Sequence, residues 1–368
     1  MVDISIVVPI YNVEEWISDC LESLVNQTHS SIEIICVDDG STDGSVAVVR
    51  KYMNRDARIK LIQQQNSGTV IARKRAVERA TGRYFLFVDP DDYLAVDACE
   101  RLLHEMAGRD CDILQYGVEI HEMSVRTEEQ RKKSAGYFNP APCTYEGADI
   151  LRACYLRTEI AFNVIFRFFE GELVRKAFKH IPDVYSINET DVFAFFFLAY
   201  HARKFVSIPD RYYHYRYGIG VSTKKTYDIP EFRRVLCKFD TLRVIKEFAE
   251  SEAYGTEDVW SAYRAVEKRM VANTFGAVFG RMGSRTDTAA AFKMACANTG
   301  MLNCIKWLAA KYAGRQADCA EMLVRNGLVE RCCAHGRIRH IGLFYYHMSC
   351  GGIQRVVQQE VSVFLQQG

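Results

Sequence analysis

The sequence lacks both a segment that could cross a bilayer and a net charge of either sign. No apolar run reaches the roughly 18 residues of a membrane span, and the start, Met1-Val2-Asp3, has no signal-peptide character. Lys and Arg total 47 against 46 Asp and Glu, so no global field favours nucleic acid or anionic lipid. We therefore expect a cytoplasmic protein without a nucleic-acid partner, with at most peripheral contact to the inner face of the cell membrane.

Several common catalytic patterns are also missing. The 13 cysteines are scattered, and Cys332-Cys333 has no second pair at zinc-finger spacing, so reduced thiols are expected. Neither a P-loop nor a dinucleotide fingerprint follows the first apolar run. No Ser-His-Asp or Cys-His set stands out. The sequence therefore lacks the residues that are usual in ATPases, in enzymes that transfer hydride and in enzymes with a covalent nucleophile.

What the chain does contain is an alternation of short apolar runs and helical periodicity over its first third. Strands are expected at residues 4–8, 32–37, 59–62, 84–88 and 112–116. Helices are expected from an Asn12 cap to near Gln27, and at 43–52, 70–80 and 96–106. This alternation predicts an α/β fold, with a mostly parallel sheet covered by helices on both faces.

The rest of the chain divides by composition. Residues 119–145 are polar and predict an exposed excursion, whereas residues 150–217 are rich in aromatic side chains. Phe193 and Phe195 to Phe197 are expected to be the core of a helix. Residues 227–326 are helical by composition and contain no chemical motif.

Polar residues gather just beyond the predicted strands, where open α/β sheets bind their ligands. Pro9 and Tyr11 follow the first strand, and the ring of Tyr11 can lie beside a flat base. Asp38 and Asp39 follow the second strand, where a carboxylate can accept a hydrogen bond from a pyrimidine imide or a ribose hydroxyl. These residues predict a nucleoside pocket.

A denser acidic cluster, Asp89, Asp91 and Asp92, follows another buried strand. Carboxylates at this density repel one another unless a cation lies among them. Mg²⁺ typically takes one or two carboxylates and completes its shell with water and phosphate oxygens. The helix after Gly68 carries Arg73, which adds positive charge near such phosphates. The cluster therefore predicts a metal that holds a diphosphate.

Taken in order, these motifs resemble family 2 glycosyltransferases, strongly over residues 1–115 and more weakly to about 225. The matching segments are Ser5-Ile-Val-Val-Pro-Ile-Tyr-Asn12, Val37-Asp-Asp-Gly-Ser-Thr-Asp43, Asn66-Ser-Gly68 with Ala72-Arg73, and Phe87-Val-Asp-Pro-Asp-Asp92. The resemblance implies the GT-A nucleotide-diphospho-sugar transferase fold. It also implies inverting transfer of a hexose or N-acetylhexosamine, from a UDP-sugar in the first place, to a glycan or lipid-linked saccharide of the cell surface.

Site residues follow from the same resemblance. Asp89 and Asp91 would be the DXD pair that binds Mn²⁺ or Mg²⁺, with Asp92 supporting them. Further along the chain, in the segment Tyr213-His-Tyr-Arg216, Arg216 could bind the diphosphate. The residues expected to bind the nucleotide sugar are Pro9, Tyr11, Asp38, Asp39, Gly68, Arg73, Asp89 and Arg216.

The general base of the family often belongs to a Glu-Asp pair that opens an aromatic helix. Here the segment reads Asn188-Glu-Thr-Asp-Val-Phe193, which puts Asp191 on the family's Asp and Thr190 on its Glu. Asp191 and Glu189 are therefore both candidate bases, and the choice stays open. Capping of the helix by Thr190 or Asp191 is the simpler alternative.

The expected domains are a GT-A domain at 1–225, with a nucleotide-binding half (1–115) and an acceptor-binding half (116–225), then a helical extension at 226–335. Residues 336–368 read as strand, glycine loop and helix, and Ser349 to Val356 resembles the opening of a family 4, GT-B type transferase domain. This last piece is expected to be the truncated start of such a domain or a closing βα unit.

Two other functions share some of these features. A sugar nucleotidyltransferase also needs acids and a metal, but the glycine- and basic-rich loop that it would ordinarily show is absent around Pro9 to Asn12. The intact acid clusters argue against a catalytically inactive scaffold that binds nucleotide sugar for a C-terminal transferase domain, but the irregular Glu189-Thr190-Asp191 keeps this function as an alternative. Donor turnover by variants at Glu189 and Asp191 separates an enzyme from a scaffold.

Overall fold

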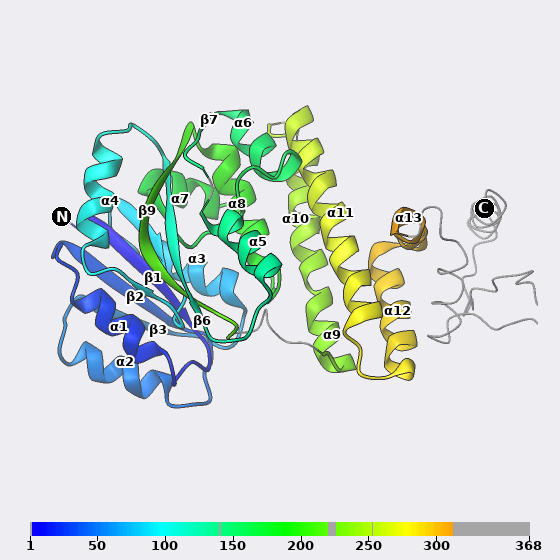
Figure 1. Cartoon of the computed structure of the whole chain (residues 1–368), viewed down its shortest axis with the longest axis horizontal. Helices are drawn as coiled ribbons and strands as arrows, with labels where there is room; N and C mark the ends of the chain where they lie inside the picture. Colours follow the sequence, from blue (N-terminus) through cyan, green and yellow to red (C-terminus); the bar gives the residue numbers. More distant parts are fainter. Residues whose placement is uncertain (1, 140, 220–225, 252, 312–368) are drawn as a thin grey trace, which may run out of the picture. The chain divides into compact units, whose positions relative to one another are not determined.

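A computed structural model describes residues 2–139, 141–219, 226–251 and 253–311 (Figure 1). The elements of the first third are β1 (Ile4–Ile10), α1 (Ile17–Val25), β2 (Ile32–Asp38), α2 (Ser45–Met53), β3 (Ile59–Gln63), α3 (Thr69–Arg79), β4 (Tyr84–Phe87), β5 (Tyr93–Leu94) and α4 (Ala98–Ala107). Next come β6 (Ile113–Glu122), α5 (Glu128–Phe138), β7 (Thr144–Glu146), α6 (Ala148–Leu151), a π-helical turn (Arg152–Leu156), β8 (Arg167–Glu170), α7 (Gly171–Phe178), α8 (Thr190–His201) and β9 (Lys204–Tyr217). The described C-terminal helices are α9 (Ile229–Leu236), α10 (Lys238–Glu250), α11 (Glu257–Gly280), α12 (Arg285–Thr299) and α13 (Met301–Lys311).

The strands form one sheet in the order β3-β2-β1-β4-β8-β6-β9-β5, with β7 paired to β9. The pairs β1–β2, β2–β3 and β1–β4 are parallel, and every residue of β1 and β2 is buried, as in a strand covered on both faces. The strand order reverses direction at β1, because β2 and β3 lie on one side of it and β4 on the other. Such a reversal opens a crevice beyond the carboxyl ends of the strands.

The helices cover both faces of this part of the sheet, as Figure 1 shows. Right-handed crossovers place α1 and α2 on one face and α3 on the other. Helix α3 packs on β1 and β2, and α7 and α8 lie against it. The expectation of an α/β fold with a helix-covered, largely parallel sheet is confirmed.

The second half of the sheet is mixed. Strand β8 lies antiparallel between β4 and β6, and β9 pairs with β6 in parallel and with β5 in antiparallel fashion. The long strand β9 therefore passes beside the loop that joins β4 to β5. The aromatic run of α8 is buried, with Phe193 and Phe195 to Phe197 all fully covered, so the core role expected for these rings is confirmed.

The element boundaries differ from the sequence expectation in a few places. Helix α1 starts at Ile17 rather than after Asn12, because Asn12 has a left-handed backbone (φ 51°) and bonds a neighbouring loop instead of capping. The two-residue strand β5 was not expected, since only its pairing with β9 defines it. The polar stretch 119–145 is not a plain loop: β6 continues through its start, and α5 forms within it.

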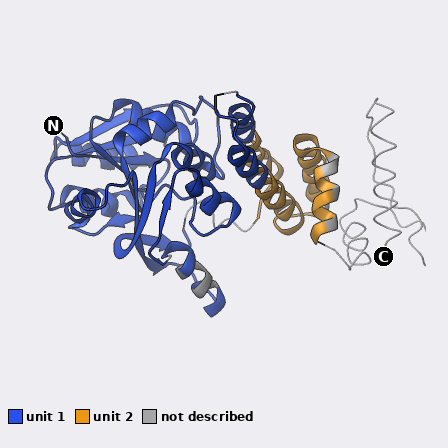
Figure 2. Ribbon diagram, turned by 90° about the horizontal axis from the view of Figure 1, so that it is seen from above, with its two compact units in different colours: residues 1–223, 240–266 blue, residues 224–239, 267–368 orange. Residues whose placement is uncertain are grey.

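The chain separates into two compact units, coloured in Figure 2. The first comprises residues 1–223 and 240–266, because the ring of Phe248 in α10 packs against Phe196, Phe197 and Tyr200 of α8. The second comprises residues 224–239 and 267–368. This division differs from a single boundary near 225, and the predicted βα unit at 336–368 lies outside the described residues.

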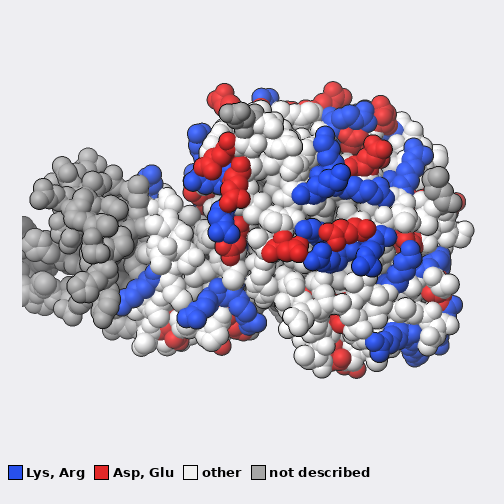
Figure 3. All heavy atoms as spheres, turned by 180° about the vertical axis from the view of Figure 1, so that it is seen from behind, with Lys and Arg blue, Asp and Glu red and all other residues white. Residues whose placement is uncertain are grey.

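The described part of the second unit is helical, as expected. Its core comes from α9, α11, α12 and α13 and contains Phe232, Leu236, Val271, Phe275, Val278, Ala291, Phe292, Ala295, Cys304 and Leu308. None of the described helices is long and apolar enough to span a membrane. Figure 3 shows basic and acidic side chains interspersed on the face drawn, in keeping with the balanced charge of the sequence.

Candidate functional site

Strand β1 ends at the crevice with Pro9, Ile10 and then Tyr11. Pro9 is buried and pairs in register with Val37 of β2. Its missing N–H is tolerated because residues 7 and 9 direct their backbone groups toward β4, whose pairing with β1 ends at Val7. Tyr11 lies just beyond and is 45% exposed, so its ring is open to a flat ligand.

Asp38, at the end of β2, is buried and stabilises the loop that follows it. Its carboxylate accepts hydrogen bonds from the Ser41 N–H (3.0 Å) and from Nε2 of Gln63 (3.2 Å). The first of these bonds closes a turn of the kind that aspartate often makes with its own chain. Asp38 therefore has a structural role that the sequence alone did not reveal.

Asp39 is also buried and ties β2 to the start of α3. It accepts from Nε2 of Gln64 (2.7 Å) and from the N–H groups of Ser67 (2.8 Å) and Gly68 (2.8 Å). An ionised carboxylate offers about four acceptor positions. Three are used within the protein, which leaves room for one more donor from a ligand.

Gly68 is required where it lies. It has φ 91°, a conformation that side chains rarely adopt, and a Cβ there would approach the Ser186 carbonyl oxygen to 2.3 Å. This close approach lets the N-terminus of α3 pack against the segment that leads to α8. Gly68 thereby helps to place Arg73, one turn further along α3, near residues from the second half of the chain.

Arg73 joins the acidic cluster to the candidate base. The side chain is only 2% exposed; its Nη2 donates to Oδ1 of Asp89 at 3.0 Å, and its Nη1 donates to Oδ1 of Asp191 at 2.5 Å. Burial alone would lower the pKa of Arg73, but Asp191 and Asp89 outweigh it and raise that pKa. A permanently charged guanidinium thus holds two carboxylates that are far apart in the sequence.

The three acids after β4 converge in space. Carboxylate oxygens of Asp89, Asp91 and Asp92 lie within 4.8 Å of one another. Burial, together with the nearby Asp91 and Asp191 charges, raises the pKa of Asp89 to about 6. Burial also raises the pKa of Asp91 and that of Asp92.

This donor set fits a hard divalent cation. Oxygen ligands close together are what Mg²⁺ and Mn²⁺ prefer. Burial, and after it the charges of the neighbouring acids, raises the pKa of Asp89 and that of Asp92, and a cation among the carboxylates would offset both effects. Asp89 and Asp91 are only partly buried. They can therefore offer oxygens to an ion that also binds a ligand.

Asp92 has a different task, because its oxygens are already hydrogen-bonded within the protein. Tyr213 donates from its hydroxyl to Oδ2 (2.8 Å), and the Arg216 N–H donates to Oδ1 (2.8 Å). The same Tyr213 oxygen accepts the Asp89 N–H (3.1 Å). Asp92 thus anchors the β4–β5 loop to β9.

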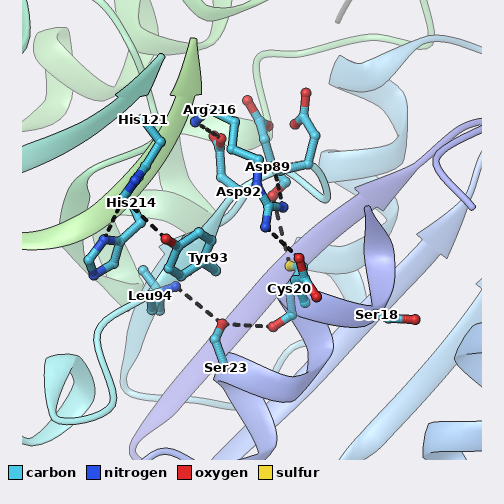
Figure 4. Close-up of polar contacts among 12 residues, drawn as sticks. Ser18, Cys20, Ser23, Asp89, Asp92, Tyr93, Leu94, His121, His214 and Arg216 are labelled. Atoms are coloured by element: carbon cyan, nitrogen blue, oxygen red, sulfur yellow. Dashed lines mark hydrogen bonds and ion pairs between the residues drawn. The ribbon is translucent and has the colours of Figure 1, made fainter. Parts of the chain in front are cut away.

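The side chain of Arg216 is held on the same loop, as Figure 4 shows. It donates to the Asp91 carbonyl oxygen (3.1 Å) and forms an ion pair with Asp19 (2.5 Å). Its guanidinium lies over the rings of Trp16 and Tyr93, 5.1 and 5.0 Å from their centroids. In this conformation Arg216 holds the β4–β5 loop against α1. This loop carries Asp89, Asp91 and Asp92 and is called the acidic loop below.

A cleft of about 410 Å³ lies beside the Arg216 side chain. Its lining residues are Asp19, Glu22, Ser23, Asn26, Tyr93, Leu94, Val96 and Arg216. Arg216 is thus shared between the acidic loop and this cleft. Among these residues only Arg216 was singled out from the sequence.

The two candidate bases are placed differently. Asp191, in the first turn of α8, is 19% exposed and reaches Arg73. Glu189 precedes the helix with a left-handed backbone (φ 57°), and its carbonyl accepts the Phe193 N–H. Neither Thr190 nor Asp191 is the N-cap residue, and no side-chain hydrogen bond caps this helix. Of the two candidates, Asp191 is the one that accepts a hydrogen bond from Arg73, which also donates to Asp89.

The structure thus places Asp89, Arg73 and Asp191 in one cluster, with Asp91 and Asp92 beside Asp89. It also adds residues that the sequence analysis did not find, namely Asp19, Trp16, Tyr93 and Tyr213. No local motif marks them, because their positions depend on α1 and β9 meeting the β4–β5 loop.

The N-terminal part of the chain is similar to known proteins. Residues 5–169 match the profile of the family described as Glycosyl transferase family 2. The Bacillus subtilis glycosyltransferase EpsJ is 45% identical over 114 residues, which are 31% of this chain and 33% of that protein. The putative teichuronic acid biosynthesis glycosyltransferase TuaG of the same species is 40% identical over 109 residues, 29% of this chain and 43% of that protein.

The chain thus spans about a third of the length of EpsJ and less than half of that of TuaG. Among solved structures, residues 1–349 of Staphylococcus aureus TarS superimpose with a TM-score of 0.57 at 18% identity, covering 94% of this chain and 99% of that one. The structure of the same TarS fragment in complex with UDP-GlcNAc gives a TM-score of 0.55 at 19% identity, with the same coverage. Residues 5–169 are therefore similar to glycosyl transferase family 2, and the chain has the GT-A fold shared with TarS, followed by a helical part.

Proposed function

We propose that this chain is an inverting, metal-dependent glycosyltransferase that moves a hexose or N-acetylhexosamine from a UDP-sugar to a saccharide or lipid-linked saccharide. The observation that carries the proposal is the bridge formed by Arg73, which bonds both Asp89 and Asp191. A metal-holding acid and a base from opposite halves of the domain must meet for a single displacement. The Arg73 bridge brings Asp89 and Asp191 together, which supports the proposal.

The donor pocket follows from the strand ends. The exposed ring of Tyr11 would stack on the base, and the remaining acceptor position of Asp39 would take a hydrogen bond from the nucleoside. The choice of UDP is supported by the fold shared with TarS, whose fragment was solved with UDP and with UDP-GlcNAc. Asp38 would shape the pocket through its turn rather than touch the ligand.

The diphosphate would lie against Asp89 and Asp91, where a bound Mn²⁺ or Mg²⁺ would supply positive charge to the departing phosphate. Asp91 would be the more direct of the two ligands, because Asp89 already accepts from Arg73. Arg216 would act indirectly, because it donates to the carbonyl oxygen of Asp91 and so helps to position that residue. Its guanidinium could reach the diphosphate only by leaving Asp19.

In the transfer step, Asp191 would accept the proton of the acceptor hydroxyl while that hydroxyl attacks the anomeric carbon opposite the diphosphate. One oxygen of Asp191 is held by Arg73, and no described residue donates to the other. Arg73 thereby fixes the direction of the second oxygen. The acceptor would be a surface glycan, in keeping with relatives named for teichuronic acid biosynthesis and as a poly(ribitol-phosphate) beta-glucosyltransferase.

The proposal is tested by UDP release from a panel of UDP-sugars, with Mn²⁺ or with EDTA, in the presence of cell-wall saccharides. The parent chain should release UDP from one donor only with the metal. Asp191→Asn should lower turnover by about 10²-fold or more, the usual scale for a lost general base, and leave donor binding intact. Glu189→Gln, the matched control, should retain most activity.

Three other results would decide against parts of the proposal. Binding of the donor without turnover under every acceptor condition would identify a scaffold. Pyrophosphate release from a nucleoside triphosphate would identify a nucleotidyltransferase. Equal turnover by the parent and Asp191→Asn, with loss in Glu189→Gln, would move the base to Glu189.

A further inference from the structure

Beside the acidic loop, three side chains that the proposed reaction does not use converge on one point. They are Tyr93 on β5, His121 on β6 and His214 on β9, drawn together in Figure 4. Nε2 of His121 lies 2.9 Å from Nδ1 of His214 and 3.1 Å from the Tyr93 hydroxyl. The rings of Tyr93 and His214 stack at 4.5 Å with an interplanar angle of 5°.

The positions of these side chains are fixed by the sheet rather than by loops. Tyr93 is directly opposite His214 in the β5–β9 register, and His121 is opposite Arg216 in the β6–β9 register. Neighbouring strands therefore hold both imidazoles before any ligand arrives. Such rigid placement is what a binding site needs, because little entropy remains to be lost.

We propose that His121, His214 and Tyr93 form a binding site for a divalent transition-metal ion that prefers imidazole ligands, such as Zn²⁺, Cu²⁺ or Ni²⁺. Two imidazole nitrogens that face each other hold at most one proton between them as a neutral pair, so one lone pair is always directed into the cluster. This site is separate from the acidic one, whose oxygen ligands suit Mg²⁺ or Mn²⁺. The inference does not depend on the proposed glycosyl transfer.

The distances are close to those that an ion requires. Two nitrogens bound at 2.0–2.1 Å to a tetrahedral ion lie about 3.3–3.4 Å apart. The observed 2.9 Å is the spacing of a hydrogen bond, so the nitrogens must separate by about half an ångström, and the rings must turn so that both lone pairs point at the ion rather than at each other. The Tyr93 oxygen is near enough to become a third ligand, and water would complete the shell.

Charge and protonation favour the same conclusion. Burial first, and His121 second, lower the pKa of His214, which keeps that imidazole in the neutral form that binds metals at pH 7. Glu119 lies opposite His214 in the β6–β9 register, and its charge is balanced by an ion pair with Arg211 (3.0 Å). All three candidate ligands are only partly buried, so an ion can enter from solvent.

The test uses the full chain with excess Mg²⁺ to saturate the acidic site, and compares Zn²⁺ binding by calorimetry with the electron paramagnetic resonance spectrum of bound Cu²⁺. The parent should bind Zn²⁺, and its Cu²⁺ spectrum should contain hyperfine coupling to two imidazole nitrogens. His121→Ala and His214→Ala should each remove one of these couplings and weaken Zn²⁺ binding at least about tenfold, because even the loss of a residue that only supports a ligand costs about that much. Tyr93→Phe should weaken it less.

Two controls separate this site from others in the chain. His104→Ala alters an exposed histidine on α4 and should leave Zn²⁺ binding unchanged, as should Asp91→Asn. His121→Asn and His214→Asn keep a polar group and check that any loss is not unfolding, with melting temperature as the readout. Parent-like Zn²⁺ affinity in folded His121 and His214 variants, or binding lost only in Asp91→Asn, would show a simple hydrogen-bonded pair and overturn the proposal.

Discussion

The two arginines that are most deeply buried among the described residues of the sheet-containing unit have very different surroundings. Arg73 bonds two carboxylates, from Asp89 and Asp191. Arg167, on β8, is fully buried and donates to the Gln115 side-chain oxygen and the Ala161 carbonyl. No described carboxylate pairs with Arg167, and its guanidinium instead lies 4.2 Å from the centroid of the Phe195 ring.

The difference appears in their protonation. Burial lowers the pKa of Arg167 to about 10, whereas the two carboxylates raise that of Arg73 in spite of its burial. Arg167 fills space in an aromatic core and donates hydrogen bonds there. Because its charge is buried without a carboxylate partner, that charge lowers the free energy of unfolding. Arg73 holds opposite charges in place, and we attribute to it a functional role that Arg167 does not share.

The largest expected effect comes from exchanging each arginine for methionine, which keeps much of the side-chain volume. Arg73→Met should abolish metal-dependent transfer and lower the free energy of unfolding by about 3–5 kcal/mol, because it leaves two carboxylates unpaired. Arg167→Met should change the free energy of unfolding by about 1–2 kcal/mol in either direction, since hydrogen bonds are lost but a buried charge is removed. Urea unfolding and UDP release measure both; equal losses in the two variants would contradict the comparison.

Removal of one acid should have the opposite effect on stability. Asp91→Asn should abolish metal-dependent transfer, yet raise the melting temperature of the metal-free chain, because burial raises the pKa of Asp91 and its charge opposes that of Asp89. Thermal melting in EDTA is the measurement. A lower melting temperature together with normal transfer would refute both the metal role and the electrostatic argument.

The pH dependence of metal binding should report Asp89. Because its pKa is raised to about 6, metal-free Asp89 takes up a proton as the pH falls through 6. Protons then compete with Mn²⁺, so stabilisation by Mn²⁺ should be fully present above pH 6 and decline below it. The same raised pKa makes the metal-free fold lose stability as the pH rises from about 4 to 6, because the folded state binds the proton more tightly.

The difference in melting temperature with Mn²⁺ and with EDTA, measured from pH 5 to 8, shows this midpoint. Arg167→Met serves as the matched control and should leave the midpoint near pH 6. A midpoint near pH 4, the ordinary value for a carboxyl group, would contradict the raised pKa of Asp89.

The smallest effect is expected for Tyr213→Phe, which removes the hydroxyl that bridges Asp92 and the Asp89 N–H. The acids themselves remain, so Mn²⁺ affinity and the KM for donor should change only several-fold, the scale of about 1 kcal/mol for one hydrogen bond. Tyr212→Phe, at the next position of β9, should have no effect on either. Donor titrations at several Mn²⁺ concentrations distinguish the two variants.

Much of the fold was predictable because its signals are local. Apolar runs and turn residues predicted β1 to β4 and the helices between them, and the strand-end acids marked one edge of the sheet. The pairing of Arg73 with Asp191 spans 118 residues, and that of Arg216 with Asp19 spans 197. Such contacts depend on how the second half of the sheet is threaded, which hydrophobic periodicity does not encode.

The same limit explains contacts that the sequence did not reveal. Asp38 and Asp39 accept hydrogen bonds from the segments that follow β2 and β3. Arg216 donates to the carbonyl oxygen of Asp91. In each case the residue type was informative, while its partner was decided by tertiary packing.

The most direct test of the central claim is calorimetric titration of UDP-N-acetylglucosamine and other UDP-sugars into the parent, Arg73→Met and Arg167→Met chains, each with Mn²⁺ or with EDTA. The account predicts that the parent and Arg167→Met bind one donor only with Mn²⁺, and that Arg73→Met binds none. Metal-independent binding by the parent, or unchanged binding by folded Arg73→Met, would contradict it.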